Sequence, residues 1–148
     1  MVFLTTLVAC DSGPDAVLRS ADDALQEGSY AEVLEEVAVG LATVDDPKRI
    51  MRLKLLELEA LARMADPQAK TLLESLAKAN PAAIGPSHYL ATADQLKAAG
   101  ETAVSVEVLN LGDIRFPDDP AIDRMIAQAG TTGDPAALEK LRSLGYVE

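Results

Sequence analysis

Residues 86–120 constrain the fold more than any other stretch of this sequence. Gly100 separates two segments of helical length, and the second segment is followed by Pro117 and Pro120. Glycine commonly closes a helix in the left-handed backbone conformation, and proline cannot continue one. The stretch therefore predicts a helix, a tight turn, a second helix and a stop. Residues 101–115 also alternate apolar and polar side chains, a pattern that taken alone favours a strand.

The rest of the chain is divided in the same way. Apolar residues recur at helical spacing between breaks, and Asp-Pro steps supply a cap and a first-turn proline for the next helix. Ser29 with Glu32 has the pattern of a capping box, and Ser87 is placed to cap the fifth helix. Eight helices are expected, including those at 14–27 and 47–65, with a loop at 81–86.

The composition also favours helices. At 148 residues the chain is long enough for one domain with a real core. Apolar residues make up 49% of it, but there are only two Phe, three Tyr and no Trp. Such a core is built from aliphatic side chains, which suits close-packed helices. The helix at 47–65 is apolar around most of its circumference, which predicts burial between neighbours.

Around Gly100 the sequence resembles a tetratricopeptide repeat (TPR), a helical hairpin of about 34 residues. The matching positions are large, small and large in the first helix, then small, large, small and proline: Tyr89, Ala93, Leu96, Ser105, Leu109, Gly112 and Pro117. A second match surrounds Gly28 and includes Gly40, whereas residues 46–81 match in length and helix order only. The resemblance implies an all-α, right-handed superhelix of antiparallel helical hairpins, a TPR-like solenoid of three to four units over residues 14–148. A generic helical bundle is the alternative.

In TPR arrays the first helix of each hairpin lines a concave groove. The resemblance therefore implies a partner-binding groove formed by Leu18, Asp22, Leu25, Leu90, Asp94 and Lys97. Apolar anchors flanked by charged side chains fit a protein or peptide partner. An ordinary solvated face is the alternative interpretation. The Lys and Asn clamp that some TPR domains use for carboxylates is absent, because Leu18 and Asp22 stand where it would be.

The N-terminus carries an apolar run without charge, residues 2–9, followed by Cys10, the only cysteine. The run is too short to span a bilayer but close in length to the apolar region of a signal peptide. Residues 7–10, Leu-Val-Ala-Cys, resemble the lipobox of bacterial lipoproteins. The resemblance implies a signal peptide at 1–9, lipidation of Cys10, and a short tether at 10–13. No Lys or Arg precedes the run, so the alternatives are a start assigned too late or a plain hydrophobic N-terminal element.

Several classes of function are disfavoured by the charge and the side-chain inventory. The net charge of −11 argues against nucleic acid, whose phosphates require clustered Lys and Arg. One basic cluster, at 48–54, is interpreted as a solvated helix start. His88 is the only histidine, so no multi-histidine zinc site or Ser-His-Asp triad is expected. Paired aspartates are interpreted as helix caps rather than as metal ligands. We expect no catalysis, metal, cofactor or small-molecule substrate.

These observations together predict a non-catalytic adaptor or scaffold that binds a protein or peptide. The lipobox would place it in the bacterial cell envelope, lipid-anchored and facing the periplasm or exterior, with a role in envelope assembly or export. Without the lipobox it would be cytoplasmic. The alternative is a structural subunit of an oligomer that uses exposed apolar helix faces, such as that of the third helix. At the other end, Tyr146 and Val147 are expected to fold back on the last hairpin.

Overall fold

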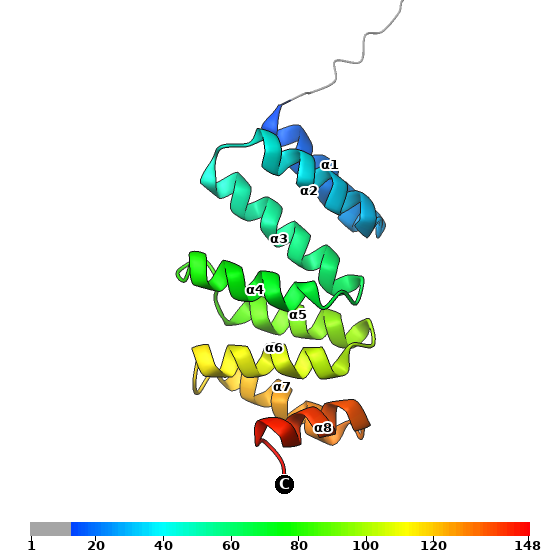
Figure 1. The fold of residues 1–148 in the computed structure, drawn as a ribbon, viewed down its shortest axis with the longest axis vertical. Coiled ribbons are helices and arrows are strands. Elements are labelled where there is room, and N and C mark those ends of the chain that lie inside the picture. Colours follow the sequence, from blue (N-terminus) through cyan, green and yellow to red (C-terminus); the bar gives the residue numbers. More distant parts are fainter. Residues whose placement is uncertain (1–12) are drawn as a thin grey trace, which may run out of the picture. The chain divides into compact units, whose positions relative to one another are not determined.

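The structure, a computed structural model, describes residues 13–148. This part of the chain consists of eight α-helices joined by short turns and contains no strand (Figure 1). The all-α prediction is confirmed. The helices are α1 (Pro14–Glu27), α2 (Tyr30–Thr43), α3 (Pro47–Arg63), α4 (Gln68–Ala79), α5 (Pro86–Ala98), α6 (Thr102–Arg115), α7 (Pro120–Thr131) and α8 (Pro135–Leu144).

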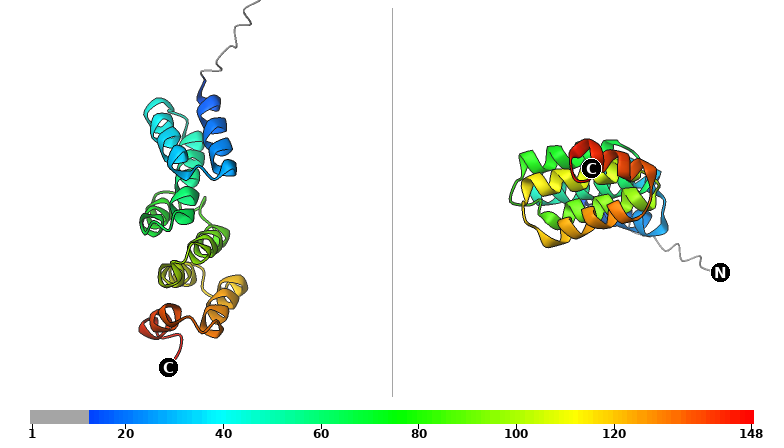
Figure 2. Two further views of the ribbon diagram at one scale, coloured as in Figure 1. Left: turned by 90° about the vertical axis from the view of Figure 1, so that its right-hand side faces the viewer. Right: turned by 90° about the horizontal axis from the view of Figure 1, so that it is seen from below.

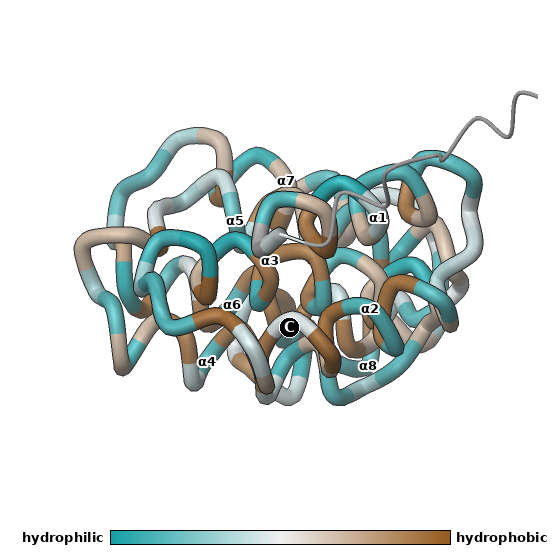
Figure 3. The backbone as a smooth tube through the Cα atoms, turned by 90° about the horizontal axis from the view of Figure 1, so that it is seen from above, coloured by the Kyte–Doolittle hydropathy of each residue, from teal (hydrophilic) through white to brown (hydrophobic). Residues whose placement is uncertain are grey.

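The chain forms two compact units, and the boundary between them falls after Leu56, within α3. In the first unit α1 and α2 pack side by side as a hairpin, and in the second unit α5 and α6 do the same (Figure 2). Helix α6 also contacts α7 and α8, so it lies at the centre of the second unit. Apolar and polar segments alternate along the helices, as expected for helices with one buried side (Figure 3).

The expected helix at 101–115 is confirmed as α6, and the strand-like alternation was misleading. The valines at 106 and 108 are both buried, with 2% and 0% of their surface exposed. Because α5, α7 and α8 cover α6 from several sides, burial is not confined to one helical stripe. An apolar pattern that alternates every second residue is therefore compatible with a helix at this position.

Helix α3 is buried along most of its length, as its composition predicted. Its buried side chains occur at successive positions around the helix and include Leu53, Leu56, Leu58, Ala60, Leu61 and Ala62. The helix ends at Arg63 rather than at 65, however. Ala65 has a positive φ of 60°, and the amide of Asp66 donates to the Leu61 carbonyl oxygen at 2.9 Å. The helix is thus closed by the left-handed turn that usually contains glycine.

Two predicted helix caps are wrong. Ser29 makes no side-chain cap to α2, and its amide donates to the Ala24 carbonyl oxygen in the turn that closes α1. Glu32 therefore has no free Ser29 amide to accept from, and the capping box does not form. Helix α5 begins at Pro86, so Ser87 lies inside its first turn. The cap is provided instead by His88, whose Nδ1 accepts from the Gly85 amide at 3.1 Å.

The Asp-Pro caps are confirmed. Asp119 accepts hydrogen bonds from the amides of residues 121 and 122 at the start of α7, and Asp134 from those of 136 and 137 at the start of α8. Asp46 accepts in the same way from the amide of residue 49. Asp66 accepts from the amide of residue 68, but Pro67 and not Asp66 is the cap residue of α4, which begins at Gln68. Gly28 and Gly145, both with positive φ, close α1 and α8. The loop 81–86 is non-helical up to Pro86, as predicted.

Candidate functional site

Small residues allow the hairpin helices to approach closely. A Cβ atom added to Gly40 of α2 would lie 2.9 Å from Val17 of α1 and 2.8 Å from Leu53 of α3. A Cβ atom added to Gly112 of α6 would lie 3.1 Å from the Cβ of Tyr89 in α5. The hydroxyl of buried Ser105 donates to the Ala93 carbonyl oxygen at 2.7 Å, which also joins α6 to α5. These close contacts fix which side of α1 and of α5 is buried in its hairpin. They thereby also fix which residues of the two helices remain accessible.

The three predicted groove residues of the first unit lie on one face of α1. Leu18, Asp22 and Leu25 are partly exposed, whereas Ala21 and Ala24 beside them are 0% and 4% exposed. Their spacing of four and three residues places them in one stripe along the helix. This stripe lies along the flank of α1, between its buried side and its fully exposed side.

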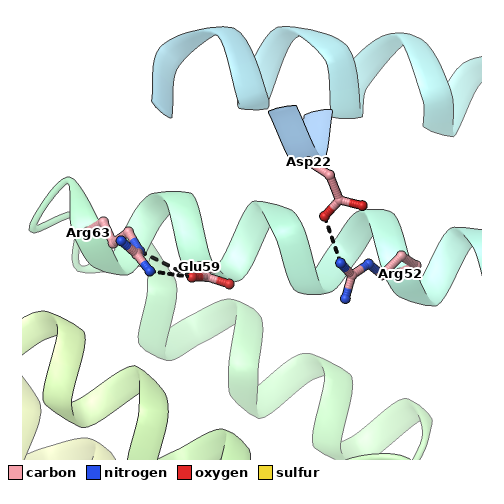
Figure 4. A network of polar contacts seen from close by, with 4 residues as sticks. All are labelled: Asp22, Arg52, Glu59 and Arg63. Carbon is pink, nitrogen blue, oxygen red and sulfur yellow. Dashed lines mark hydrogen bonds and ion pairs between the residues drawn. The ribbon is translucent and has the colours of Figure 1, made fainter. Parts of the chain in front are cut away.

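Asp22 is held by an ion pair that the sequence did not predict. Its Oδ1 lies 2.6 Å from Nη2 of Arg52 in α3 (Figure 4). A second pair of the same kind joins Asp15 of α1 to Arg49 of α3 at 2.9 Å. Two members of the basic cluster at 48–54 therefore bind carboxylates of α1, although the cluster was interpreted as a solvated helix start. The partners are 30 and 34 residues apart, so no local spacing could have revealed them.

The three predicted groove residues of the second unit form an equivalent stripe on α5. Leu90 is partly exposed and Asp94 and Lys97 are exposed, whereas Ala93 and Leu96 are completely buried. The spacing is again four and three residues. The structure therefore places one predicted triad on α1 of the first unit and the other on α5 of the second.

The structure also contains a hollow that sequence reasoning missed, here called the Tyr89 hollow. It has a volume of about 330 Å³ and lies between α4, α5 and α6 of the second unit. Tyr89, predicted only as a large residue at a repeat position, forms part of its wall. The Tyr89 ring packs edge-to-face on Phe116, with ring centroids 5.9 Å apart. On the other side, the Arg115 guanidinium lies 5.7 Å from the Phe116 centroid and donates to the Pro81 carbonyl oxygen at 3.3 Å.

The C-terminal tail is tied to α6. The Tyr146 hydroxyl donates to Asp113 Oδ2 at 2.6 Å and lies 3.1 Å from Asn110 Oδ1. Burial and the neighbouring Asp113 carboxylate raise the Tyr146 pKa well above its usual value. Val147 helps to line a smaller hollow of about 250 Å³ together with Ile126 and Leu141. The prediction that the tail folds back on the last hairpin is confirmed, with α6 as an additional partner.

One carboxylate links three helices of the second unit. Glu107 of α6 lies 2.6 Å from Lys70 of α4 and 2.5 Å from Lys140 of α8. Hydrogen bonds from Lys140 and Lys70 lower the Glu107 pKa below its usual value. Because both lysines are engaged by Glu107, this cluster is a structural clasp.

Within residues 13–148, no group of three or more His, Cys, Asp or Glu side chains is arranged to hold a metal ion. None of the helices in the same part of the chain is long and apolar enough to cross a membrane. The predicted signal peptide at 1–9 and Cys10 lie outside the residues that the structure describes.

Comparison with known proteins gives no relative for this chain: no family model, curated protein or solved structure matches it significantly.

Proposed function

We propose that this chain is a non-catalytic adaptor that binds a protein or peptide through the partly exposed stripes of α1 and α5. The single observation that carries the proposal is the repetition of the same arrangement in both hairpins. In each, residues four and three positions apart stay at least partly exposed beside fully or nearly fully buried neighbours. Each stripe combines leucine with charged side chains, which is the composition of a surface that binds a peptide or helix.

In this proposal the helices form three to four TPR-like hairpins of a right-handed superhelix, and the first helix of a hairpin contributes its stripe to partner binding. Cys10 would carry lipid and anchor the chain in a bacterial envelope, because several acyl chains on one residue give stable membrane attachment. The adaptor would then work in envelope assembly or export. The TPR-like and lipobox-like sequence patterns support both parts of the proposal.

A photo-crosslinking amino acid placed at Leu18 or at Leu90 tests the binding surface. We expect both positions to yield a crosslinked product of the same size in cells, and the matched exposed position Glu139 of α8 to yield none. Alanine at both leucines of the otherwise unchanged chain should weaken capture of that product. Equal crosslinking at Glu139, or capture unaffected by the double substitution, would refute the groove.

The anchor requires its own test. We expect mass spectrometry of the membrane fraction to find a chain that begins at Cys10 and carries several acyl groups, and the Cys10→Ser variant to lack them. An unmodified chain starting at Met1 would remove the envelope assignment and leave a cytoplasmic adaptor. The alternative function, a subunit of an oligomer, has less support because four of the five leucines of α3 are buried. Concentration-dependent sedimentation of the chain distinguishes an obligate dimer from a monomer.

A further inference from the structure

The Tyr89 hollow has the features of a second binding site, and none of the six groove residues lines it. Its apolar wall consists of Ala77 of α4 with Leu111 and Ile114 of α6. Ile114 is 71% exposed, the largest exposure among the large apolar side chains of residues 13–148. The volume of about 330 Å³ falls within the range of pockets that hold ligands in proteins.

The hydroxyl of Tyr89, a lining residue of this hollow, has no partner in the described chain. Only 3% of the residue is exposed, and no hydrogen bond joins its hydroxyl to any residue among 13–148. In the same part of the chain, every fully enclosed polar side-chain atom has a partner. The Tyr89 hydroxyl is therefore not fully enclosed, and it belongs to a residue that lines the hollow together with Arg115 and Glu74. A polar group held in such surroundings gains from a hydrogen bond that a bound molecule supplies.

The hollow also concentrates positive charge on an acidic protein. Lys78 forms no ion pair with any residue of the described chain, and Arg115 donates to a backbone oxygen rather than to a carboxylate. Glu74 is the one acidic residue of the lining, so the local excess is one positive charge on a chain of net charge −11. Each cation directly follows an apolar wall residue, Ala77 before Lys78 and Ile114 before Arg115.

We propose that the Tyr89 hollow is a docking site for a segment of a partner protein that presents an apolar side chain beside a carboxylate. The apolar side chain enters between Ile114 and Leu111 and covers the exposed isoleucine. The carboxylate accepts hydrogen bonds from Arg115 and from the Tyr89 hydroxyl. Burial raises the pKa of Tyr89, which keeps this hydroxyl protonated as a donor. The partner group is negatively charged in this proposal because the lining has two cations, Lys78 and Arg115, against one anion, Glu74.

The test uses the isotope-labelled full chain and a short acetylated and amidated Gly/Ser peptide with a central Leu-Glu pair. We expect saturable shifts of the backbone amide signals of residues 77, 111, 114 and 115. Peptides with Leu-Gln or Ala-Glu at the centre should bind at least about fivefold more weakly, since each lacks one of the two recognised groups. Equal affinity for the Leu-Gln peptide, or no shift at these residues, would overturn the proposal.

Single substitutions identify which side chains of the hollow contact the peptide. Tyr89→Phe keeps the ring and removes only the unpartnered hydroxyl, so it should fold normally and bind the Leu-Glu peptide about tenfold more weakly. Arg115→Gln should have a similar effect. Arg124→Gln makes the same charge change at an exposed position of α7, outside both the hollow and the groove, and should leave the affinity unaltered. If Arg124→Gln weakens binding as much as Arg115→Gln, general charge attraction is responsible. If 3-phenylpropanoate binds as tightly as the peptide, the site is for a small acid and not for a protein.

Discussion

Gly40 and Gly112 occupy equivalent places in their hairpins, each late in the second helix and facing the first. Their neighbours differ in how easily they move. The contacts of Gly40 are the ends of Leu53 and Val17 side chains, whereas Gly112 faces the Cβ and Cγ atoms of Tyr89, which are close to the α5 backbone. A side chain at Gly112 therefore requires the helices themselves to separate.

We predict that Gly112→Ala destabilises the protein by about 1–3 kcal/mol, the usual cost of overpacking a well-packed core. Gly130→Ala is the matched control, because its added Cβ meets nothing closer than 3.7 Å. That variant should be neutral or more stable by up to about 1 kcal/mol, since alanine favours a helix over glycine. Urea unfolding of the two variants measures both effects. A Gly112→Ala chain as stable as Gly130→Ala would contradict the close contact.

Ala65 adopts a left-handed conformation that glycine adopts without strain, with φ of 60°. We predict that Ala65→Gly raises the free energy of unfolding by about 1 kcal/mol. The same substitution at exposed Ala38 within α2 should lower it by about 1 kcal/mol, because glycine is a poor helix former there. Thermal unfolding of the two variants should shift in opposite directions. A shift in the same direction would show that the turn after α3 is not strained.

The Tyr146 hydroxyl gives the tail a characteristic dependence on pH. The pKa of this hydroxyl is raised above 10.0 in the folded chain. Its contribution to the free energy of unfolding is therefore fully present below pH 10 and is lost as the pH rises through the raised pKa. We predict that Tyr146→Phe is less stable by about 1 kcal/mol at neutral pH. The difference between the two proteins should shrink above pH 10, which chemical unfolding at a series of pH values measures. A difference that stays constant up to pH 11 would contradict the bond to Asp113.

At the scale of elements, α6 shows both the strength and the weakness of sequence patterns. The turn at Gly100 and the stop at Pro117 delimited the helix correctly, because glycine and proline act through local backbone geometry. The alternating valines suggested the wrong secondary structure, because three neighbouring helices bury more than one side of α6. Caps assigned from serine failed at Ser29 and Ser87 for a similar reason. In both places a neighbouring turn or a proline had already fixed where the helix begins.

The Glu107 clasp joins α4, α6 and α8, and the stabilisation that it gives the protein should depend on pH. The Glu107 pKa is lowered, so the stabilisation is present above the ordinary carboxyl pKa of 4.5 and is lost as the pH falls through the lowered value. We predict that Glu107→Gln costs about 1 kcal/mol at pH 7 and progressively less below pH 4.5. Glu139→Gln on the exposed side of α8 should change stability by less than about 0.5 kcal/mol. A similar loss in both variants would point to net charge rather than to the clasp.

At the scale of the whole chain, sequence reasoning succeeded where the cause is local and failed where it is distant. The helical spacing of apolar residues predicted the eight helices and the buried face of α5. The positions of glycine and proline predicted most of the helix ends. The partners of Arg52 and Glu107 were not predicted, because they lie 30 or more residues away. The six groove residues were located on their helices correctly, but binding by them is still a proposal. The Tyr89 hollow had no sequence signal, since its wall combines residues from three helices.

The Asp-Pro steps have a chemical consequence. Four aspartates that precede helices, at 46, 66, 119 and 134, are followed by proline, and Asp-Pro is the peptide bond that warm dilute acid hydrolyses most readily. Each of these bonds lies just before or at the start of a helix and none lies inside one. Acid hydrolysis should therefore divide the chain into pieces that keep every helix whole, with α1 and α2 on one fragment and α4, α5 and α6 on another. The aspartates that precede these four helices thus also provide a way to cut the molecule between helices.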